Sequence, residues 1–269
     1  MVSFPHCKIN LGLHVVEKRS DGYHTIETCF YPVPRTDILE VIKADAFAFT
    51  TSGLPVPGEA DQNLCVKAYR LLANDFNLHP VKIYLHKIIP MGAGVGGGSA
   101  DAAFTLRLLN SLFQLNLSQE QLKSYAVQLG SDCTFFLQDQ PMLAGGRGEM
   151  LSQAPVSLKG KYIVLVKPGV HVSTAEAYAG IVPSKPAQSL KSVLQMPLES
   201  WREKLVNDFE VPVFRSFPVI AGLKARLYEN GAAYACMSGS GASVFGIFNA
   251  PVDLNTQFAD VDYWAGTFA

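Results

Sequence analysis

The feature that most constrains this chain is a glycine-rich loop in its first half. Residues 90–103 read PMGAGVGGGSADAA, and five of the seven residues from Gly92 to Gly98 are glycine. Without Cβ atoms, consecutive backbone N–H groups can point into one concavity, and a helix that follows adds the positive end of its dipole. A strand-like segment precedes the loop and a helix-like segment follows it, so the sequence predicts an anion site suited to phosphate.

Three other interpretations of this loop are weaker. Gly92, Gly94 and Gly97 match GxGxxG, but a dinucleotide-binding fold places that motif in the first turn of a regular βαβ unit. No Lys follows the last glycine, which excludes a Walker A loop. A flexible linker is disfavoured because the loop lies tightly between two predicted elements.

Apolar periodicity and turn residues predict mixed strands and helices without a βαβ rhythm, which favours an α+β fold. In the first half, the predicted elements are a hairpin of a half-buried strand over 8–16 with a second β-rich run over 23–31, strand-like alternation over 37–51, and a strand over 81–89. The predicted helices cover 64–76, 99–113 and the segment from a Ser118–Gln121 capping box to Gly130. Asp101 is expected in the first turn of its helix. In the second half they are a strand over 162–166, a short helix capped by Ser173 and Glu176, a loop over 183–192, helices over 199–208 and 217–229, and two strands flanking 238–241.

Composition excludes several classes of protein. Net charge is −1 with no long basic run, so a nucleic-acid partner is not expected. The sequence lacks both the run of about 18 apolar residues that a membrane span requires and a signal-peptide pattern. Five scattered cysteines and no metal-ligand spacing argue against a disulfide framework or a zinc site. We therefore expect a reduced, cytoplasmic enzyme.

Lys8 and Asn10 stand two residues apart on the first predicted strand, so their side chains share one face, opposite its apolar residues. They are either the solvated side of that strand or a pair that orients a carboxylate and a substrate hydroxyl. Asp132 lies between a predicted helix end and an apolar run. It is either a helix cap or the base that takes an alcohol proton in phosphoryl transfer, kept ionised by a nearby Lys8.

Residues 237–243 read MSGSGAS between two predicted strands. They form either a plain hairpin turn or a second small-residue loop that packs against the first glycine loop. The second arrangement would let a phosphate or a substrate approach the backbone.

Taken in order, these segments resemble the GHMP small-molecule kinase superfamily and, within it, the diphosphocytidyl-methylerythritol kinases. The motifs that carry the resemblance are KINL at 8–11, RSDGYH at 19–24, GVGGGS at 94–99, KPG at 167–169, STAEAY at 173–178 and NDFE at 207–210. Together the matches run from about residue 8 to residue 248, nearly the whole chain.

The resemblance implies a two-domain GHMP-kinase architecture. An N-terminal ATP-binding domain over 1–154 would resemble domain 2 of ribosomal protein S5, and a ferredoxin-like domain would cover 155–269, with the active site in the cleft between them. ATP and Mg²⁺ would serve to phosphorylate the 2-hydroxyl of 4-diphosphocytidyl-2-C-methyl-D-erythritol, in the non-mevalonate route to isoprenoids. We expect a monomer or a homodimer.

The resemblance also implies roles for single residues. Asp132 would be the base and Lys8 its partner, while Asn10 holds the acceptor. Tyr23 and Tyr178 would sandwich the cytosine, a physically reasonable way to select a pyrimidine. The remaining implied residues are His24 at the cytosine edge; Thr174 near the methylerythritol or its diphosphate; Asn63, Leu64 and Lys87 around adenine; Pro90, Met91, Gly92, Ala93, Gly94, Val95, Gly96, Gly97, Gly98, Ser99 and Ala100 at the ATP phosphates; and Ser99 again at Mg²⁺.

The chain departs from the family pattern at Val95, Ala100, Ser131, Cys133 and Thr134. Loss of a second serine at Ala100 would alter contacts to Mg²⁺ or phosphate, but the proposed chemistry keeps its main residues. Three alternatives remain: a GHMP kinase for homoserine, mevalonate or a sugar, which would not need the aromatic residues of DGYH; a nicotinamide-dependent oxidoreductase; and a non-catalytic nucleotide-binding module, which would have lost the Lys/Asp pair.

Overall fold

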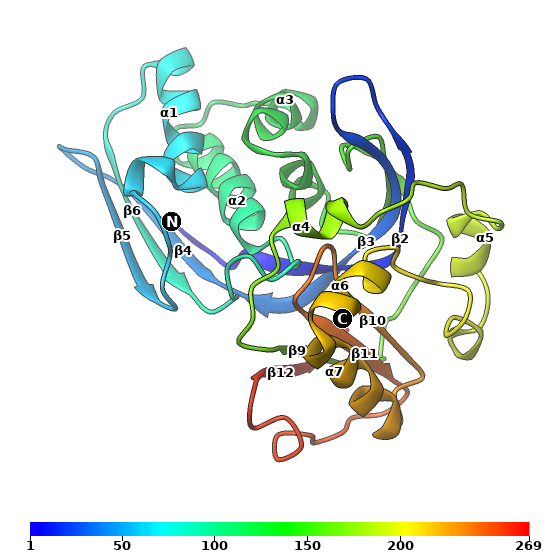
Figure 1. The fold of residues 1–269 in the computed structure, drawn as a ribbon. Helices are drawn as coiled ribbons and strands as arrows, with labels where there is room; N and C mark the ends of the chain where they lie inside the picture. Colours follow the sequence, from blue (N-terminus) through cyan, green and yellow to red (C-terminus); the bar gives the residue numbers. More distant parts are fainter. Residues whose placement is uncertain (269) are drawn as a thin grey trace. The chain divides into compact units, whose positions relative to one another are not determined.

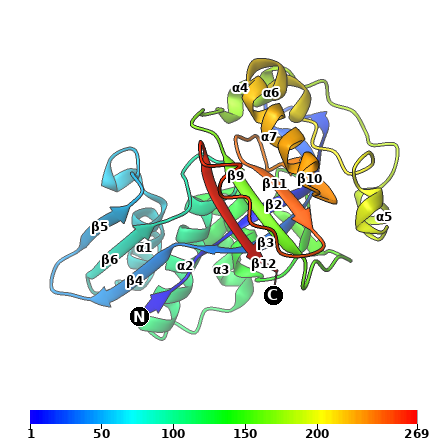
Figure 2. The same ribbon diagram turned by 90° about the horizontal axis from the view of Figure 1, so that it is seen from below.

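The structure is a computed structural model that describes residues 1–268 (Figures 1 and 2). The chain forms two compact units, each of which is discontinuous in sequence. Unit 1 comprises residues 1–7, 35–91 and 96–139, and unit 2 comprises 8–34, 92–95 and the chain from Gln140 onward. The glycine loop therefore belongs to both units, because the chain crosses after Met91 and again after Val95.

Unit 1 is built on a four-stranded sheet. Its strands, in spatial order, are β1 (Val2–Ser3), β4 (Ile38–Lys43), β6 (Val81–Lys87) and β5 (Ala48–Gly53). Along β6 the side chains alternate between buried and exposed, as the sequence predicts. The strand-like alternation predicted over 37–51 is confirmed as two strands, because β4 runs antiparallel to β6 and β5 runs parallel to it. The chain reverses direction between β4 and β5, which periodicity alone does not reveal.

The helices of unit 1 are α1 (Leu64–Phe76), α2 (Gly97–Leu112) and α3 (Gln119–Leu129), with 3₁₀ turns η1 (Ala60–Gln62) and η2 (Ser131–Leu137). These helices pack on one another, and α2 contacts strands β1 and β4 of the sheet (Figure 1). The predicted capping box of Ser118 and Gln121 is confirmed, and Gly130 ends α3. Helix α2 begins at Gly97, two residues earlier than predicted. Asp101 therefore lies beyond the first turn, and the expected contact with the helix dipole is wrong.

The first sheet of unit 2 contains the predicted hairpin. Its strands, in spatial order, are β2 (His6–Lys18), β3 (His24–Thr36), β7 (Met142–Gly145) and β8 (Met150–Gln153). The two hairpin strands are longer than predicted, and β7 and β8 were not predicted. Residues 7–15 of β2 are all buried, so the expectation of a half-buried strand is wrong. Both faces of this strand are covered.

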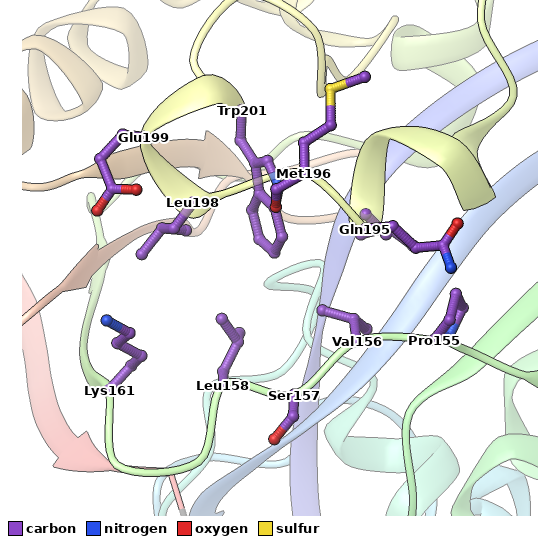
Figure 3. Close-up of a pocket in the computed structure, with 11 residues that line it drawn as sticks. Pro155, Val156, Ser157, Leu158, Lys161, Gln195, Met196, Leu198, Glu199 and Trp201 are labelled. Carbon is purple, nitrogen blue, oxygen red and sulfur yellow. The ribbon is translucent and has the colours of Figure 1, made fainter.

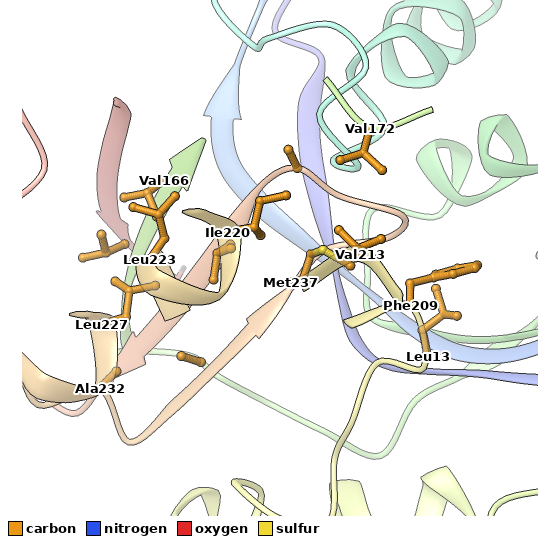
Figure 4. Close-up of a cluster of buried hydrophobic side chains, with 14 of the residues drawn as sticks. Leu13, Val166, Val172, Phe209, Val213, Ile220, Leu223, Leu227, Ala232 and Met237 are labelled. Atoms are coloured by element: carbon orange, nitrogen blue, oxygen red, sulfur yellow. The ribbon is translucent and has the colours of Figure 1, made fainter. Parts of the chain in front are cut away.

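The second sheet of unit 2 is antiparallel throughout. Its spatial order is β10 (Tyr234–Met237), β11 (Val244–Phe248), β9 (Tyr162–Lys167) and β12 (Asp262–Thr267), which is the strand order of a ferredoxin-like sheet. Helices α6 (Glu210–Ser216) and α7 (Pro218–Glu229) pack on it. Their side chains Val213, Ile220 and Leu223 meet Val166 and Met237 from the strands in one apolar core (Figure 4).

Three short elements complete unit 2: α4 (Thr174–Ala179), α5 (Leu190–Leu194) and η3 (Leu198–Ser200). The Ser173–Glu176 capping box of α4 is confirmed. The helix predicted over 199–208 is wrong, because the main chain at Val206 and Asp208 hydrogen-bonds to Leu13 of β2 and is extended there. The loop predicted over 183–192 is interrupted by α5, and β12 was not predicted.

Within residues 1–268, no helix combines the length and the apolar character that crossing a bilayer requires.

Candidate functional site

The glycine loop is held by its carbonyl groups. Three consecutive carbonyls accept hydrogen bonds from elsewhere in unit 2: Ala93 O from Ser243 N (3.2 Å), Gly94 O from Ser238 Oγ (2.9 Å) and Lys8 Nζ (3.3 Å), and Val95 O from Lys8 N (2.9 Å). A peptide group whose carbonyl is fixed on one side directs the N–H of the next residue to the other side. The loop is therefore oriented before any ligand arrives.

The amides that follow these carbonyls are not consumed. Among the described residues 1–268, the N–H groups of Gly94, Val95 and Gly96 have no acceptor within the chain. Gly94 (φ +75°) and Gly96 (φ +72°) adopt the left-handed conformation that favours glycine, and Gly96 is the N-cap of α2. Unpaired amides beside a helix N-terminus suit a phosphate group.

The second small-residue loop packs against the first. A Cβ on Gly94 would collide with the carbonyl oxygen of Ser238, and one on Gly239 would lie 3.0 Å from Gly94 O. The residues in contact, Gly94 and 238–239, belong to unit 2. Residues 237–243 are therefore more than a plain hairpin turn, which is the other interpretation that the sequence left open.

Lys8 and Asn10 share one face of β2, as predicted, but that face is not solvated. Lys8 is 3% exposed and Asn10 is 1% exposed. Lys8 Nζ donates to Asn10 Oδ1 at 2.5 Å and lies 4.8 Å from the centre of the Phe30 ring. Asn10 Nδ2 donates to Thr28 Oγ1 (2.9 Å), which in turn donates to Gly12 O (2.5 Å). This chain of donors fixes the amide so that its oxygen faces the Lys8 ammonium.

The predicted cytosine residues are partly assembled. The His24 ring stacks on Tyr178 with centroids 4.6 Å apart and an interplanar angle of 21°, and Tyr178 contacts Phe209 edge-on. Tyr23 is 57% exposed, with the Arg147 guanidinium 4.8 Å from its ring centre. In this arrangement His24 covers one face of Tyr178. Their roles stay predictions.

Unit 1 contains a pocket of about 100 Å³. Its lining includes four of the residues expected to bind ATP, which are Asn63, Leu64, Met91 and Gly98. Asn63 also caps α1, because its side chain accepts a hydrogen bond from Cys65 N (2.9 Å). The other lining residues are Val56, Pro57, Gln62, Leu85 and Asp101.

A buried ion cluster adjoins this pocket. Lys87 Nζ donates to Asp37 Oδ2 (2.5 Å) and to Asp101 Oδ2 (2.8 Å), and the Lys87 side chain is completely buried. Asp37 Oδ1 also accepts from the N–H groups of Ile88 (2.6 Å) and Ile89 (2.8 Å). Lys87 does not line the pocket itself, but it contacts Asp101, which does.

The two carboxylates of this cluster differ in their hydrogen bonds. Among residues 1–268, Oδ1 of Asp101 has no partner, although the residue is only 2% exposed. Burial raises the pKa of Asp101 to about 7, against the Lys87 ammonium, which lowers it, and with the Asp37 carboxylate, which raises it further. Burial alone would lower the pKa of Lys87, but Asp101 and Asp37 outweigh it and raise that pKa. One residue of the pocket lining, Asp101, is thus a buried carboxyl group that protonates near neutrality.

Asp132 lies in the first turn of η2 and is half-buried. The residue at the N-cap is Gly130, so the interpretation of Asp132 as the helix cap is wrong. Ser99 lies in the first turn of α2, where its hydroxyl interacts with the Cys133 thiol. Burial, with Asp132 adding to it, raises the pKa of Cys133 to about 12 and keeps it a neutral thiol. Within residues 1–268, no cluster of three His, Cys, Asp or Glu side chains could hold a metal ion by itself.

A larger cavity of about 440 Å³ lies in unit 2, between residues 155–161 and 194–201 (Figure 3). Trp201, Leu198 and Leu158 form its apolar part, and Lys161 and Glu199 lie at one end. None of the residues predicted to bind ATP or substrate lines this cavity. The cavity with the greater volume of the two is therefore not the one that the predicted ATP-binding residues line.

Sequence reasoning missed two carboxylates that the structure makes prominent. Asp37 precedes β4 and carries no recognisable motif. Asp101 was noticed only for its helix position, although a carboxylate directly after a glycine loop could have suggested a buried partner such as Lys87.

Two family models match this chain. The model of the GHMP kinases N terminal domain matches residues 63–146, and the model of the GHMP kinases C terminal domain matches residues 188–257. These segments lie on either side of the predicted domain boundary between residues 154 and 155, which stays a prediction.

Individual proteins match over nearly the full length. The 4-diphosphocytidyl-2-C-methyl-D-erythritol kinase of Cytophaga hutchinsonii is 52% identical over 250 residues, covering 93% of each chain. The protein of the same name from Parabacteroides distasonis is 48% identical over 268 residues, covering 99% of each. A crystal structure of a 4-(cytidine 5'-diphospho)-2C-methyl-D-erythritol kinase superposes with a TM-score of 0.85 at 32% identity, covering 99% of this chain and 98% of that one.

Proposed function

Because this chain belongs to the 4-diphosphocytidyl-2-C-methyl-D-erythritol kinase family, we propose that Lys8, Asp132 and the glycine loop carry phosphoryl transfer from ATP to the 2-hydroxyl of that substrate. The protein is an ATP-dependent kinase of the non-mevalonate pathway to isoprenoid precursors, with the two-domain α+β fold of the GHMP kinases. The observation that carries the proposed site is the glycine loop itself, whose carbonyls are fixed and whose amides are unpaired.

The glycine loop would bind the ATP phosphates. The unpaired amides of Gly94, Val95 and Gly96 provide donors without a side chain, and the N-terminus of α2 adds a favourable dipole. Since phosphoryl transfer has a loose transition state, donors that are already oriented stabilise its charge without a reorganisation cost.

Asp132 would accept the proton of the acceptor hydroxyl, and Lys8 would hold the charge near the reacting oxygens. Lys8 is suited to this role because Asn10 and the Gly94 carbonyl fix its ammonium group in a buried position. Asn10 retains one N–H beyond its bond to Thr28 with which to hold the acceptor.

The unit 1 pocket would take the adenine of ATP. Asn63 and Leu64 line it, as the family pattern implies, and so does Asp101, whose Oδ1 has no partner among residues 1–268. An exocyclic amino group is the donor that an adenine offers to such an oxygen. Lys87 would act at this pocket by holding Asp101 in place.

Mg²⁺ would be held by the Ser99 hydroxyl together with ATP oxygens and water. This fits, because Mg²⁺ usually keeps several waters and takes few protein ligands, and because Ser99 lies in the first turn of the helix that follows the glycine loop. When bound, the ion would neutralise charge on the ATP phosphates.

The cytidine acceptor would be recognised in unit 2. Tyr178 and His24 already form an aromatic surface, and Thr174 is the first residue of α4 on the same segment as Tyr178. Tyr23 would close on the second face of the base. A neutral cytosine suits aromatic stacking with one directed hydrogen bond.

Two further expectations accompany this function. All five cysteines are buried free thiols, which supports the expected reducing, cytoplasmic compartment. We keep the expectation that the protein is a monomer or a homodimer, which gel filtration with light scattering would decide.

The deciding experiment measures ADP release with Mg-ATP and each of four acceptors: the cytidine substrate, homoserine, mevalonate and galactose. We expect turnover with the cytidine substrate alone. Asp132→Asn should lower kcat by about 10³-fold or more while nucleotide binding persists, because the base is lost and the shape is kept. The matched control is Glu120→Gln, the same charge change at an exposed position of α3 in the same unit. Turnover of a different acceptor, or near-normal turnover of Asp132→Asn, would refute the corresponding assignment.

A further inference from the structure

The segment 207–210 (NDFE) has no role in the chemistry described above, yet Asn207, Phe209 and Glu210 are buried in unit 2. Asn207 is 2% exposed. Its main chain forms a bridge with Leu13 of β2, the strand that carries Lys8 and Asn10. The bridge to β2 fixes the main chain of Asn207 and therefore the position from which its side chain extends.

The Asn207 side chain makes three hydrogen bonds. Its Nδ2 donates to Met237 O and to Gly239 O, both at 2.8 Å, and its Oδ1 accepts from Phe209 N at 3.0 Å. An aspartate here would place an acceptor against two carbonyl oxygens, and an aliphatic residue would leave both carbonyls buried without a donor. Only a side-chain amide satisfies the three partners.

Glu210 also hydrogen-bonds to the main chain of Met237. Its Oε1 accepts from Met237 N at 2.9 Å, while its Oε2 accepts from Lys224 Nζ at 2.6 Å. Both main-chain polar groups of Met237, the last residue of β10, are therefore held by side chains of the 207–210 segment. These two hydrogen bonds fix the main chain at Met237, where the second small-residue loop begins.

The second small-residue loop is hydrogen-bonded to the glycine loop. Ser238 follows Met237, and its hydroxyl donates to Gly94 O at 2.9 Å. The same carbonyl oxygen accepts from Lys8 Nζ at 3.3 Å. Contacts thus run without a gap from Asn207 through residues 237–239 to Gly94 and the Lys8 ammonium.

We infer that Asn207 is a positioning residue for phosphoryl transfer: by holding residues 237–239 it sets the direction of the Gly94 carbonyl, and through it the place of Lys8 and of the amides after Gly94. The inference rests on the proposed function, because it assumes that Lys8 and the glycine loop act on ATP. A misplacement of about 1 Å in such a site can lower turnover by about 100-fold.

The test compares Asn207→Ala, Ser238→Ala and the double variant, with kcat and both KM values measured well below each Tm. We expect each single variant to lower kcat by about 10- to 100-fold, with a smaller rise in KM for the cytidine substrate. The double variant should be within about twofold of Asn207→Ala, because both changes interrupt one path. Effects that multiply in the double variant would overturn the inference.

Asp208→Asn is the matched control. The Asp208 carboxylate is hydrogen-bonded to β2, through Val15 N (2.8 Å) and His14 Nδ1 (3.2 Å), and among residues 1–268 it makes no hydrogen bond to the 237–239 loop. We expect this variant to lower Tm and to leave kcat of the folded protein unchanged. If Asn207→Ala lowers only Tm in the same way, Asn207 is structural and the inference is wrong.

Ser238→Ala keeps the test decisive if Asn207→Ala does not fold, because it removes one hydroxyl and leaves the buried carbonyls paired. Unchanged kcat in Ser238→Ala would overturn the inference by itself. Absence of turnover in the unmodified protein would instead refute the proposed function, so the two failures are distinguishable.

Discussion

Replacing Lys87 by methionine should reduce the free energy of unfolding by about 3–5 kcal/mol at pH 8, since breaking a buried ion cluster leaves carboxylates without a partner. The Lys87 side chain is completely buried between Asp37 and Asp101. Asp37 would keep its bonds from the N–H groups of Ile88 and Ile89, but Asp101 would lose the one cation that contacts it among residues 1–268. Most of the loss should therefore come from Asp101.

The size of this loss should depend on pH. The pKa of Asp101 is already raised to about 7 in the folded protein, so its contribution to stability is fully present below its unfolded pKa and is lost as the pH rises through 7. Without Lys87, which lowers that pKa, Asp101 would titrate still higher, and the mutant would continue to lose stability after the unmodified protein has stopped. The difference between the two proteins should widen by about 1 kcal/mol per pH unit above 7.

Thermal unfolding at pH 5.5 and pH 8, with urea titration at each pH, measures this. For a chain of this size, 3–5 kcal/mol corresponds to a Tm decrease of about 6–20 °C. The double variant with Asp101→Asn should recover about 1–2 kcal/mol at pH 8, because it removes the uncompensated charge. The matched control is Lys82→Met, on the exposed face of the same strand. Equal losses at both pH values, or a double variant less stable than Lys87→Met alone, would refute this reasoning.

Three other outcomes are expected. Tyr23→Ala should raise KM for the cytidine substrate by about tenfold with little change in kcat, and Tyr23→Phe should not; steady-state kinetics would show an unchanged KM if Tyr23 does not stack on the base. Gly94→Ala should lower kcat/KM for ATP by about 100-fold or more, because its Cβ would collide with the Ser238 carbonyl, whereas Gly160→Ala, also at positive φ but with nothing within 4 Å, should keep normal kinetics. Ser118→Ala should cost about 1 kcal/mol in a melting experiment through loss of the α3 capping box, and a Tm within error of the original would contradict the cap.

The sequence predicted those parts of the fold whose cause is local. Helix α1, the capping boxes at Ser118 and Ser173, and the strands around residues 238–241 follow from periodicity, side-chain caps and turn residues over a few positions. The family assignment is confirmed because its motifs are ordered along the whole chain. Such features do not depend on what the rest of the molecule packs against them.

Other parts depend on partners distant in the sequence. The pattern over 199–208 is typical of a helix, but the main chain at Val206 and Asp208 pairs with Leu13 instead. Leu13 is far away in the sequence, so the residues around 199–208 do not reveal this pairing. Burial of Lys8 and Asn10 likewise depends on how β2 is covered, and the sequence alone left the solvated alternative open. Clusters formed from separate elements, such as Lys87 with its two carboxylates, are the hardest to predict for the same reason.

If the unit 1 pocket takes the nucleotide, Asp101 Oδ1, which has no partner among residues 1–268, would couple nucleotide occupancy to proton exchange. An amino group that donates to this oxygen favours the ionised carboxyl, so a nucleotide in the unit 1 pocket should expel part of a proton near pH 7. The affinity for the nucleotide should then rise with pH. It should level off once Asp101 is already ionised in the protein without nucleotide. The heat of binding would differ between phosphate and Tris in proportion to the protons released, so calorimetry could count them without turnover.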